Sequence, residues 1–235
     1  MVLPQDFITY TRALMGSERY DKMASALLEE PSVSLRLNPF KTLSGITEVC
    51  NADGQVPWAS NGFYLSGRPN FTFDPLFHAG TYYVQEASSM FVAWIVSQLI
   101  HIPITMLDLC AAPGGKSTAL RSVLPKGSLL FCNEPMPQRS NILAENVQKF
   151  GHPDMVVTNN FAADYRKSGL QFDVILADVP CSGEGMFRKD AGAIAEWSEA
   201  NVEHCWRLQR EIISDIWPCL KPGGLLIYST CTFND

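Results

Sequence analysis

The sequence has few charged residues and no excess of positive charge. Charged residues make up 18% of the 235 residues, and the formal net charge is −6. A negatively charged protein does not draw nucleic acid to itself by long-range attraction, although a local basic groove can still bind it. This balance argues against a protein that binds nucleic acid indiscriminately.

An uninterrupted apolar run of membrane-spanning length is also absent. The most apolar region, residues 87–107, is broken by Gln98, His101 and Pro103. Such a pattern is typical of a buried helix followed by a strand. We therefore expect no membrane partner.

Paired cysteines are missing as well. The seven cysteines are an odd number without a Cys-x-x-Cys pair, and no secretory leader is apparent at the start. These features predict reduced thiols and a cytoplasmic location. The four histidines are scattered without the spacing of metal ligands: His78, His101, His152 and His204. We expect no metal site.

From residue 104 onwards, short apolar runs alternate with helical segments, as in a parallel sheet with right-handed crossovers. The predicted strands cover residues 104–109, 128–133, 155–158, 172–178 and 224–230. The predicted helices lie near residues 116–124, 137–150 and 202–220, and an earlier helix runs to about Ile100. The expected fold class is α/β with a Rossmann-like sheet.

The N-terminal part predicts a small α+β domain. Residues 5–30 have helical spacing, with a break at Gly16-Ser17 and a stop at Pro31. A strand follows at residues 34–37, and residues 51–68 predict loop and short strand. We place the domains at residues 1–76 and 77–235.

A tight glycine turn follows the first strand of the predicted sheet, in Asp-Leu-Cys-Ala-Ala-Pro-Gly-Gly-Lys-Ser from Asp108 to Ser117. A strand that breaks into glycines and then opens a helix directs backbone N–H groups at a ligand. A Walker loop would need glycine where Cys110 stands, and the dinucleotide fingerprint fails because Gly114 and Gly115 are adjacent. A cofactor with an adenosine but no phosphate remains, namely S-adenosylmethionine.

An acid follows the second strand of the predicted sheet. Glu134 lies roughly 20 residues after the glycine turn, where comparable folds place a carboxylate on the ribose hydroxyls. We therefore predict that Glu134 binds the ribose of the cofactor.

Two cysteines lie just beyond the ends of the fourth and fifth predicted strands. Cys181 follows Asp178, and Cys231 follows the last strand. If the first, fourth and fifth strands are neighbours, their carboxyl ends open into one crevice. The other cysteines, Cys50, Cys132, Cys205 and Cys219, are typical of small buried apolar residues.

A thiol beside a methyl donor suggests methylation of a pyrimidine at carbon 5. A thiolate that adds at carbon 6 turns the ring into an enamine-like nucleophile. Lys116 and the cationic sulfonium are candidate sources of a lowered thiol pKa. Asp178 could hydrogen-bond the base and stabilise the charge that develops.

Three motifs in this order resemble the signature motifs of the Nol-Nop-Sun family of RNA (cytosine-5) methyltransferases, particularly its bacterial ribosomal-RNA branch. They are Asp-Leu-Cys-Ala-Ala-Pro-Gly-Gly-Lys-Ser, Asp-Val-Pro-Cys-Ser-Gly-Glu-Gly-Met-Phe-Arg-Lys-Asp and Tyr-Ser-Thr-Cys-Thr. The resemblance implies an S-adenosylmethionine-dependent methyltransferase sheet, with the N-terminal domain on the side of the RNA. It also implies methyl transfer to a cytosine in 16S ribosomal RNA.

The resemblance also implies roles for individual residues. Cys231 would be the nucleophile and Cys181 the helper that promotes product release, while Asp178 and Lys116 would support the nucleophile and the target base. The cofactor would lie against Cys110, Ala111, Ala112, Pro113, Gly114, Gly115, Lys116, Glu134 and Asp178.

The chain departs from the family pattern at two places. The aspartate that meets the adenine after the third strand is replaced by Asn159-Asn160, so either Asn160 or Asp164 is expected at that position. The chain ends at Asp235, directly after the fifth strand, where such sheets continue. We therefore expect a sheet that is truncated after its fifth strand.

Several alternatives stay open. The target could be transfer RNA, or the chain could be a non-catalytic ribosome assembly factor that binds S-adenosylmethionine and needs neither thiol. A DNA methyltransferase would need Glu-Asn-Val beyond Cys181, whereas Glu145-Asn146-Val147 precedes it.

Candidate phosphate contacts are Arg36, Arg188 and Lys189. The residues carry no signal for an oligomeric state.

Overall fold

The computed structural model describes residues 2–41 and 52–234. The chain divides into two compact units. The first, which we call the sheet unit, comprises Ser32–Asp178 and Ile216–Ile227. The second, which we call the thiol unit, comprises Met1–Pro31, Val179–Asp215 and Tyr228–Asp235. The domain boundary that we place at residue 76 stays a prediction.

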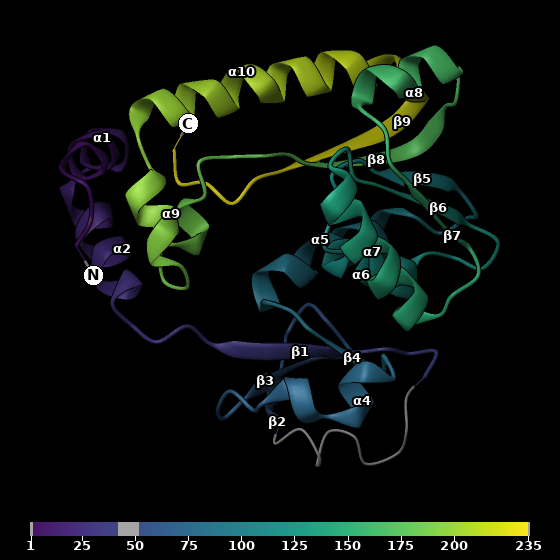
Figure 1. The fold of residues 1–235 in the computed structure, drawn as a ribbon, viewed down its shortest axis with the longest axis horizontal. Coiled ribbons are helices and arrows are strands. Elements are labelled where there is room, and N and C mark those ends of the chain that lie inside the picture. The colour runs from purple at the N-terminus through teal and green to yellow at the C-terminus, as the bar shows by residue number, and fades with distance from the viewer. Residues whose placement is uncertain (1, 42–51, 235) are drawn as a thin grey trace. The chain divides into compact units, whose positions relative to one another are not determined.

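A five-stranded sheet forms the centre of the sheet unit (Figure 1). Its strands are β5 (Thr105–Asp108), β6 (Leu129–Asn133), β7 (Met155–Thr158), β8 (Phe172–Asp178) and β9 (Leu220–Ser229). The order across the sheet is β7-β6-β5-β8-β9, and β5 pairs in parallel with both β6 and β8. The predicted fold class and the neighbouring first, fourth and fifth strands are confirmed.

Three helices connect β5 to β8 in turn: α6 (Gly115–Val123), α7 (Pro137–Phe150) and α8 (Ala162–Ser168). A further helix, α5 (Ala87–Leu99), precedes β5. Figure 1 shows α5, α6 and α7 beside the strands. Apolar side chains of the strands and helices, among them Met106, Leu130 and Leu143, are fully buried together. Helix α7 begins with Pro137, whose nitrogen carries no hydrogen and needs no acceptor. It ends at Phe150 and is capped by Gly151 with φ +80°.

The segment before β9 differs from the prediction. Helix α10 covers Glu199–Ile216 and therefore ends earlier than the predicted helix over residues 202–220. A short 3-10 turn, η3 (Trp217–Cys219), follows, and β9 starts at Leu220 instead of residue 224. Pro218 explains the early end, because it lacks the N–H that a continuing α-helix requires.

A second sheet in the same unit has four antiparallel strands in the order β2-β3-β1-β4. They are β1 (Val33–Leu37), β2 (Ala52–Gln55), β3 (Gly62–Leu65) and β4 (Tyr82–Val84). Two short helices, η1 (Phe71–Phe73) and α4 (Pro75–His78), lie between β3 and β4 in the chain. The prediction of β1 is confirmed, and loop with short strand was predicted over residues 51–68. The short strands β2 and β3 both lie in this range, and because Ala-Asp-Gly-Gln of β2 has little intrinsic strand preference, its pairing with β3 sets where it forms. Asn51 lies outside the described residues, as does Cys50, which we predicted to be buried.

Arg36 of β1 corrects one sequence-based expectation. Its residue exposure is only 4%, so it does not offer its charge to RNA phosphates as predicted. The guanidinium donates to Gln85 Oε1, Gly115 O, Thr118 Oγ1 and Ser122 Oγ at 2.9, 3.3, 2.6 and 3.2 Å. Arg36 therefore joins the small sheet to the start of α6. The phosphate roles of Arg188 and Lys189 stay predictions.

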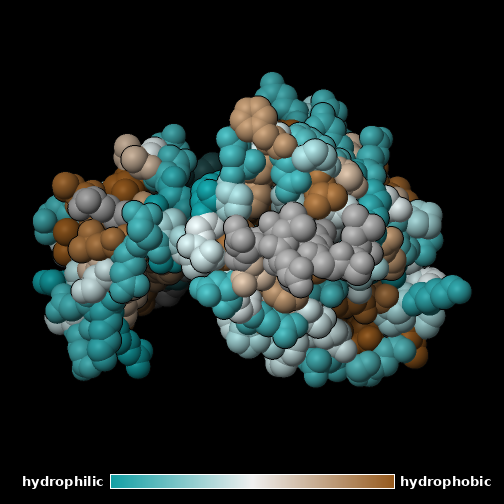
Figure 2. All heavy atoms as spheres, turned by 90° about the horizontal axis from the view of Figure 1, so that it is seen from below, coloured by the Kyte–Doolittle hydropathy of each residue, from teal (hydrophilic) through white to brown (hydrophobic). Residues whose placement is uncertain are grey.

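The thiol unit is built from helices and loops. Its helices are α1 (Gln5–Met15), α2 (Ser17–Leu27), η2 (Glu184–Met186), α9 (Ala191–Glu196) and α10. Phe7 of α1 packs edge-on against Phe187 and Trp197, with ring centroids 5.2 and 5.3 Å apart. The break at Gly16 agrees with the prediction. Apolar side chains also reach the surface of this unit at Val2, Leu14 and Leu28, and brown patches are visible at the left of Figure 2.

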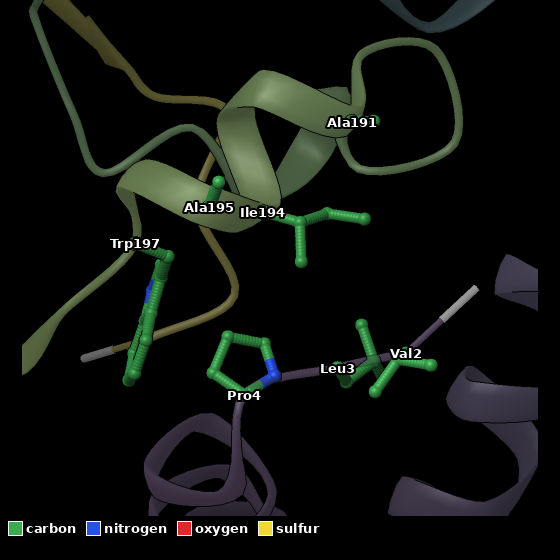
Figure 3. Close-up of a pocket in the computed structure, with 7 residues that line it drawn as sticks. All are labelled: Val2, Leu3, Pro4, Ala191, Ile194, Ala195 and Trp197. Atoms are coloured by element: carbon green, nitrogen blue, oxygen red, sulfur yellow. The ribbon is translucent and has the colours of Figure 1, made fainter.

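An apolar cavity of about 490 Å³ lies within the thiol unit. Figure 3 shows Ile194 and Ala195 of α9 across the cavity from Leu3 and Pro4 of the N-terminal segment. Trp197 closes one side. Because its lining side chains are apolar, the cavity offers packing surface rather than chemistry.

None of the helices in the described ranges is both long and apolar enough to cross a membrane.

The buried Arg36 generates a stability prediction. Arg36→Met should lower the free energy of unfolding by about 3 kcal/mol, because it leaves several buried acceptors without a donor. Urea denaturation measures this change. As a control, Arg207→Ala removes an exposed arginine that pairs with Glu203, and should cost no more than about 0.5 kcal/mol. Equal effects of both variants would contradict the structural role of Arg36.

Candidate active site

The glycine turn lies between β5 and α6, as predicted. Gly114 has φ +108°, a conformation that residues with a side chain rarely adopt, and it immediately precedes α6. A Cβ atom on Gly115 would lie 3.1 Å from the Tyr83 ring. The turn is held from outside, since Arg139 donates to Ala112 O at 3.1 Å and Asn146 donates to Pro113 O at 2.8 Å. Small residues thus keep the backbone open towards a ligand.

Asp108, the last residue of β5, is a fully buried carboxyl at the start of this turn. Its Oδ2 accepts a 2.6 Å hydrogen bond from the Ser117 hydroxyl. Its Oδ1 has no hydrogen-bond partner among the described residues. Burial raises the pKa of Asp108 to about 7. We did not assign this residue a role from the sequence, although an acid at the end of the strand before a glycine turn could have indicated one.

Glu134 lies just after β6 and is 1% exposed. Its Oε1 accepts from the Met136 N–H at 3.1 Å. Its Oε2 lies 3.4 Å from Arg139 Nη1 but lacks a hydrogen-bond partner in the described part of the chain. Since β5 and β6 are adjacent, two neighbouring strands each end in a buried carboxyl with an unused acceptor oxygen. Such acceptors fit the hydroxyl and amino groups of a ligand such as S-adenosylmethionine.

The ends of β5, β6 and β7 are tied together by Asn133. Its amide donates to Leu109 O at 3.0 Å and to Asn160 O at 2.9 Å, and its Oδ1 accepts from the Asn160 N–H. Asn160 is therefore fixed beside this edge. Asp164 instead caps α8 through the Phe161 N–H and pairs with Lys167 at 3.2 Å, which favours Asn160 as the adenine contact.

Lys116 and Asp178 form an ion pair. Lys116 Nζ lies 2.7 Å from Asp178 Oδ2, and their side chains are 24% and 26% exposed. The pair joins the first turn of α6 to the end of β8. Both predicted residues are thus in contact and accessible to a ligand.

Cys181 and Cys231 are brought together within the thiol unit, with their sulfur atoms 3.1 Å apart. Hydrogen bonds from the Cys231 thiol and from the backbone of Gly183 and Cys231 lower the pKa of Cys181 to about 6. From the sequence, we attributed a lowered thiol pKa to Lys116 and the sulfonium. In the structure, the hydrogen-bond donors that lower the pKa of Cys181 belong to Gly183 and Cys231. Two further backbone bonds join the chain segments that flank the two cysteines, from the N–H of Val179 to Ser229 O at 3.0 Å and from the N–H of Gly185 to Cys231 O at 2.8 Å.

The remaining described cysteines do not resemble nucleophiles. Burial, together with nearby carboxylates, raises the pKa of Cys110 to about 12. Cys132, Cys205 and Cys219 are buried, as expected for small apolar residues, and their pKa values are raised by the same cause. Within the ranges that the structure describes, no group of three or more potential metal-binding side chains comes together.

The chain is similar in sequence to methyltransferases of ribosomal RNA. A family model described as 16S rRNA methyltransferase RsmB/F matches residues 103–235, and a second, the N-terminal domain of 16S rRNA methyltransferase RsmF, matches residues 3–87. Ribosomal RNA small subunit methyltransferase F of Shewanella loihica is 37% identical over 215 residues, which cover 86% of this chain and 44% of that protein. The chain spans about half the length of the curated relatives that it matches.

Solved structures give the same fold. The crystal structure of PH0851 superposes with a TM-score of 0.88 at 26% identity, covering 99% of this chain and 54% of that one. The structure of NSun6 from Pyrococcus horikoshii with SFG has a TM-score of 0.82 at 19% identity, covering 97% of this chain and 83% of that one.

The raised pKa of Asp108 generates a prediction about pH. The folded protein holds this proton up to about pH 7, whereas the unfolded chain releases it near its ordinary value of 3.8. The stabilising contribution is therefore complete below pH 3.8 and is lost as the pH rises through about 7. Between about pH 5 and pH 8, the unfolding free energy should fall less steeply for Asp108→Asn than for the unchanged chain.

Urea denaturation across this pH range measures the slope. Asp164→Asn is the matched control, because hydrogen bonds from Lys167 and Phe161 lower the pKa of Asp164, so that its contribution is lost only in more acidic solution. Identical slopes for Asp108→Asn and the unchanged chain would show that Asp108 is ionised throughout.

Proposed function

Since the chain belongs to the 16S rRNA methyltransferase RsmB/F family, we propose that it methylates carbon 5 of a cytosine in RNA, with 16S ribosomal RNA as the substrate. The observation that carries this proposal is the contact between Cys181 and Cys231, because methylation at carbon 5 requires a thiolate. A non-catalytic assembly factor would need the cofactor site but no such pair.

The cofactor of the proposed reaction is S-adenosylmethionine, which supplies a methyl group on a positively charged sulfur when bound. We assign its binding to residues 110–116, Glu134, Asn160 and Asp178, and we add Asp108 on the basis of its unused Oδ1. Glu134 Oε2 would accept from a ribose hydroxyl, and Asp108 would form a hydrogen bond with a polar group of the cofactor through its Oδ1. The NSun6 structure from Pyrococcus horikoshii contains SFG, an analogue of this cofactor.

The thiol pair suggests how the nucleophile is generated. Either sulfur of the pair can be the donor, and we assign the donated proton to Cys231, because the pKa of Cys181 is lowered to about 6 and favours its thiolate at neutral pH. Transfer of this proton leaves a thiolate on Cys231 and a thiol on Cys181. Cys231, the more exposed of the two, would then form a bond to carbon 6 of the cytosine.

The charged pair would act on the base itself. We assign the Asp178 carboxylate to the exocyclic amine of the cytosine, from which it would accept a hydrogen bond. Lys116 holds that carboxylate through the 2.7 Å ion pair. After methylation, Cys181, which loses its proton to solvent again because its pKa is lowered to about 6, would take the proton from carbon 5. The electron pair of that bond returns to the ring and breaks the bond between carbon 6 and sulfur, so that Cys231 leaves as a thiolate. Cys181 promotes this release in the proposed scheme.

Separate replacement of the two thiols tests these roles. Cys231→Ala should abolish methylation of 16S ribosomal RNA while it leaves cofactor affinity unchanged, because the first covalent bond cannot form. Cys181→Ala should form the adduct slowly near pH 7, faster above about pH 8.5, and then retain it. Methyl incorporation from labelled cofactor and a denaturant-resistant band of protein bound to RNA measure the two effects.

Cys205→Ala is the matched control, since Cys205 is buried in α10 and has a raised pKa. It should keep near-normal turnover. Full turnover by Cys231→Ala would refute the assignment of the nucleophile, and the absence of an adduct with Cys181→Ala at every pH would refute the release role.

A further inference from the structure

Glu184, at the start of η2, is a buried carboxylate that bonds to both thiol loops. We define the Cys181 loop as residues 179–183 and the Cys231 loop as residues 230–234. Glu184 is 1% exposed, and its Oε1 accepts from the Ser182 hydroxyl at 2.8 Å and from Asn234 Nδ2 at 2.6 Å. One oxygen atom therefore links a residue next to Cys181 with a residue that lies three positions after Cys231.

The same oxygen is anchored in the core of the thiol unit. Trp197 Nε1 donates to Glu184 Oε1 at 2.7 Å, and the Trp197 ring packs against Phe7 of α1. The adjacent η2 residue Gly185 adds a backbone bond to Cys231 O at 2.8 Å. A Cβ atom on Gly185 would come within 2.9 Å of this oxygen, so the approach requires glycine.

The charge of Glu184 opposes ionisation of the nearby thiol. Its carboxylate acts to raise the pKa of Cys181, whereas the hydrogen bond from Cys231 lowers it. Cys205 and Tyr228 are the further titratable groups that interact with Cys181 inside this unit. A residue selected only to favour the thiolate would not be negative. The contribution of Glu184 to the thiol pair therefore comes from its hydrogen bonds and not from its negative charge.

We propose that Glu184 is a positioning residue, which holds the Cys181 loop and the Cys231 loop so that their sulfur atoms stay in contact. The inference rests on the proposed methyl transfer for its purpose, but the contact itself can be measured without RNA. Glu184 Oε2 has no hydrogen-bond partner among residues 2–41 and 52–234, so a glutamine could keep all three bonds through its single carbonyl oxygen.

The test compares Glu184→Ala with Glu184→Gln. The pH profile of alkylation by iodoacetamide, followed for the Cys181 peptide by mass spectrometry, reports ionisation of the thiol. In Glu184→Ala the midpoint should rise from about 6 towards the ordinary value of 9.0, because Cys231 no longer donates. In Glu184→Gln the midpoint should stay at or below that of the unchanged chain, because the bonds persist and the opposing charge is gone.

Methylation kinetics give the second readout. Glu184→Ala should lower kcat about 100-fold with little change in KM for RNA, as expected when reacting groups are displaced by about 1 Å. Glu184→Gln should restore most of kcat. Glu203→Ala, which removes an exposed glutamate from α10, is the matched control and should change neither the midpoint nor kcat.

Two results would overturn the proposal. One is an unchanged midpoint in folded Glu184→Ala, and the other is a Glu184→Gln variant as inactive as Glu184→Ala, which would assign the role to the carboxylate charge. If Glu184→Ala does not fold, Asn234→Ala keeps Glu184 but removes the bonds from Asn234 Nδ2 to Glu184 Oε1 and to Ser182 Oγ, and it should still raise the midpoint. If the unchanged chain methylates no RNA, the proposed function fails, while the alkylation profiles still decide the role of Glu184.

Discussion

The hydrogen bond between the thiols of Cys181 and Cys231 is the contact that the proposed chemistry requires and that the thiol unit maintains. The two residues are 50 positions apart in sequence, and their sulfur atoms lie 3.1 Å apart. Backbone bonds join their loops on both sides, and Glu184 links the loops to Trp197. A thiol that donates to its neighbour lowers the neighbour's pKa, so the pair can hold one negative charge at neutral pH without a lysine or arginine. In the proposed mechanism, this arrangement would prepare a nucleophile before any substrate arrives.

The sheet unit uses buried charge in a different way. Asp108 and Glu134 are buried carboxyls at the ends of adjacent strands, and each keeps one oxygen without a hydrogen bond inside the described chain. Leaving such groups unpaired costs stability, which is a usual feature of sites that await a ligand. Arg36, by contrast, has its donors engaged and fastens the small sheet to α6. In the proposed function, the buried carboxyls at the strand ends would bind the cofactor, whereas the buried guanidinium of Arg36 gives rigidity behind the glycine turn.

The sequence predicted those features that depend on local pattern. The apolar runs predicted the positions of β5 to β8 closely. The glycine turn and the segments that contain Cys181 and Cys231 were found because site residues follow the ends of parallel strands. The features that were missed depend on contacts between distant residues. Arg36 is buried against Thr118 of α6, 82 positions away, and Glu184 gains its role only when it meets Asn234, 50 positions away. Sequence separation of tens of residues hides such partners from any local pattern.

The most direct measurement uses RNA in which the target cytosine carries fluorine at carbon 5. After attack by a thiolate and methylation, the fluorine cannot leave as a proton would, so the protein stays bound to carbon 6. Mass spectrometry of the trapped peptide identifies the attached residue. We expect a bond to Cys231 that forms only when S-adenosylmethionine is present. A bond to Cys181, or no bond while ordinary RNA is methylated, would contradict the mechanism.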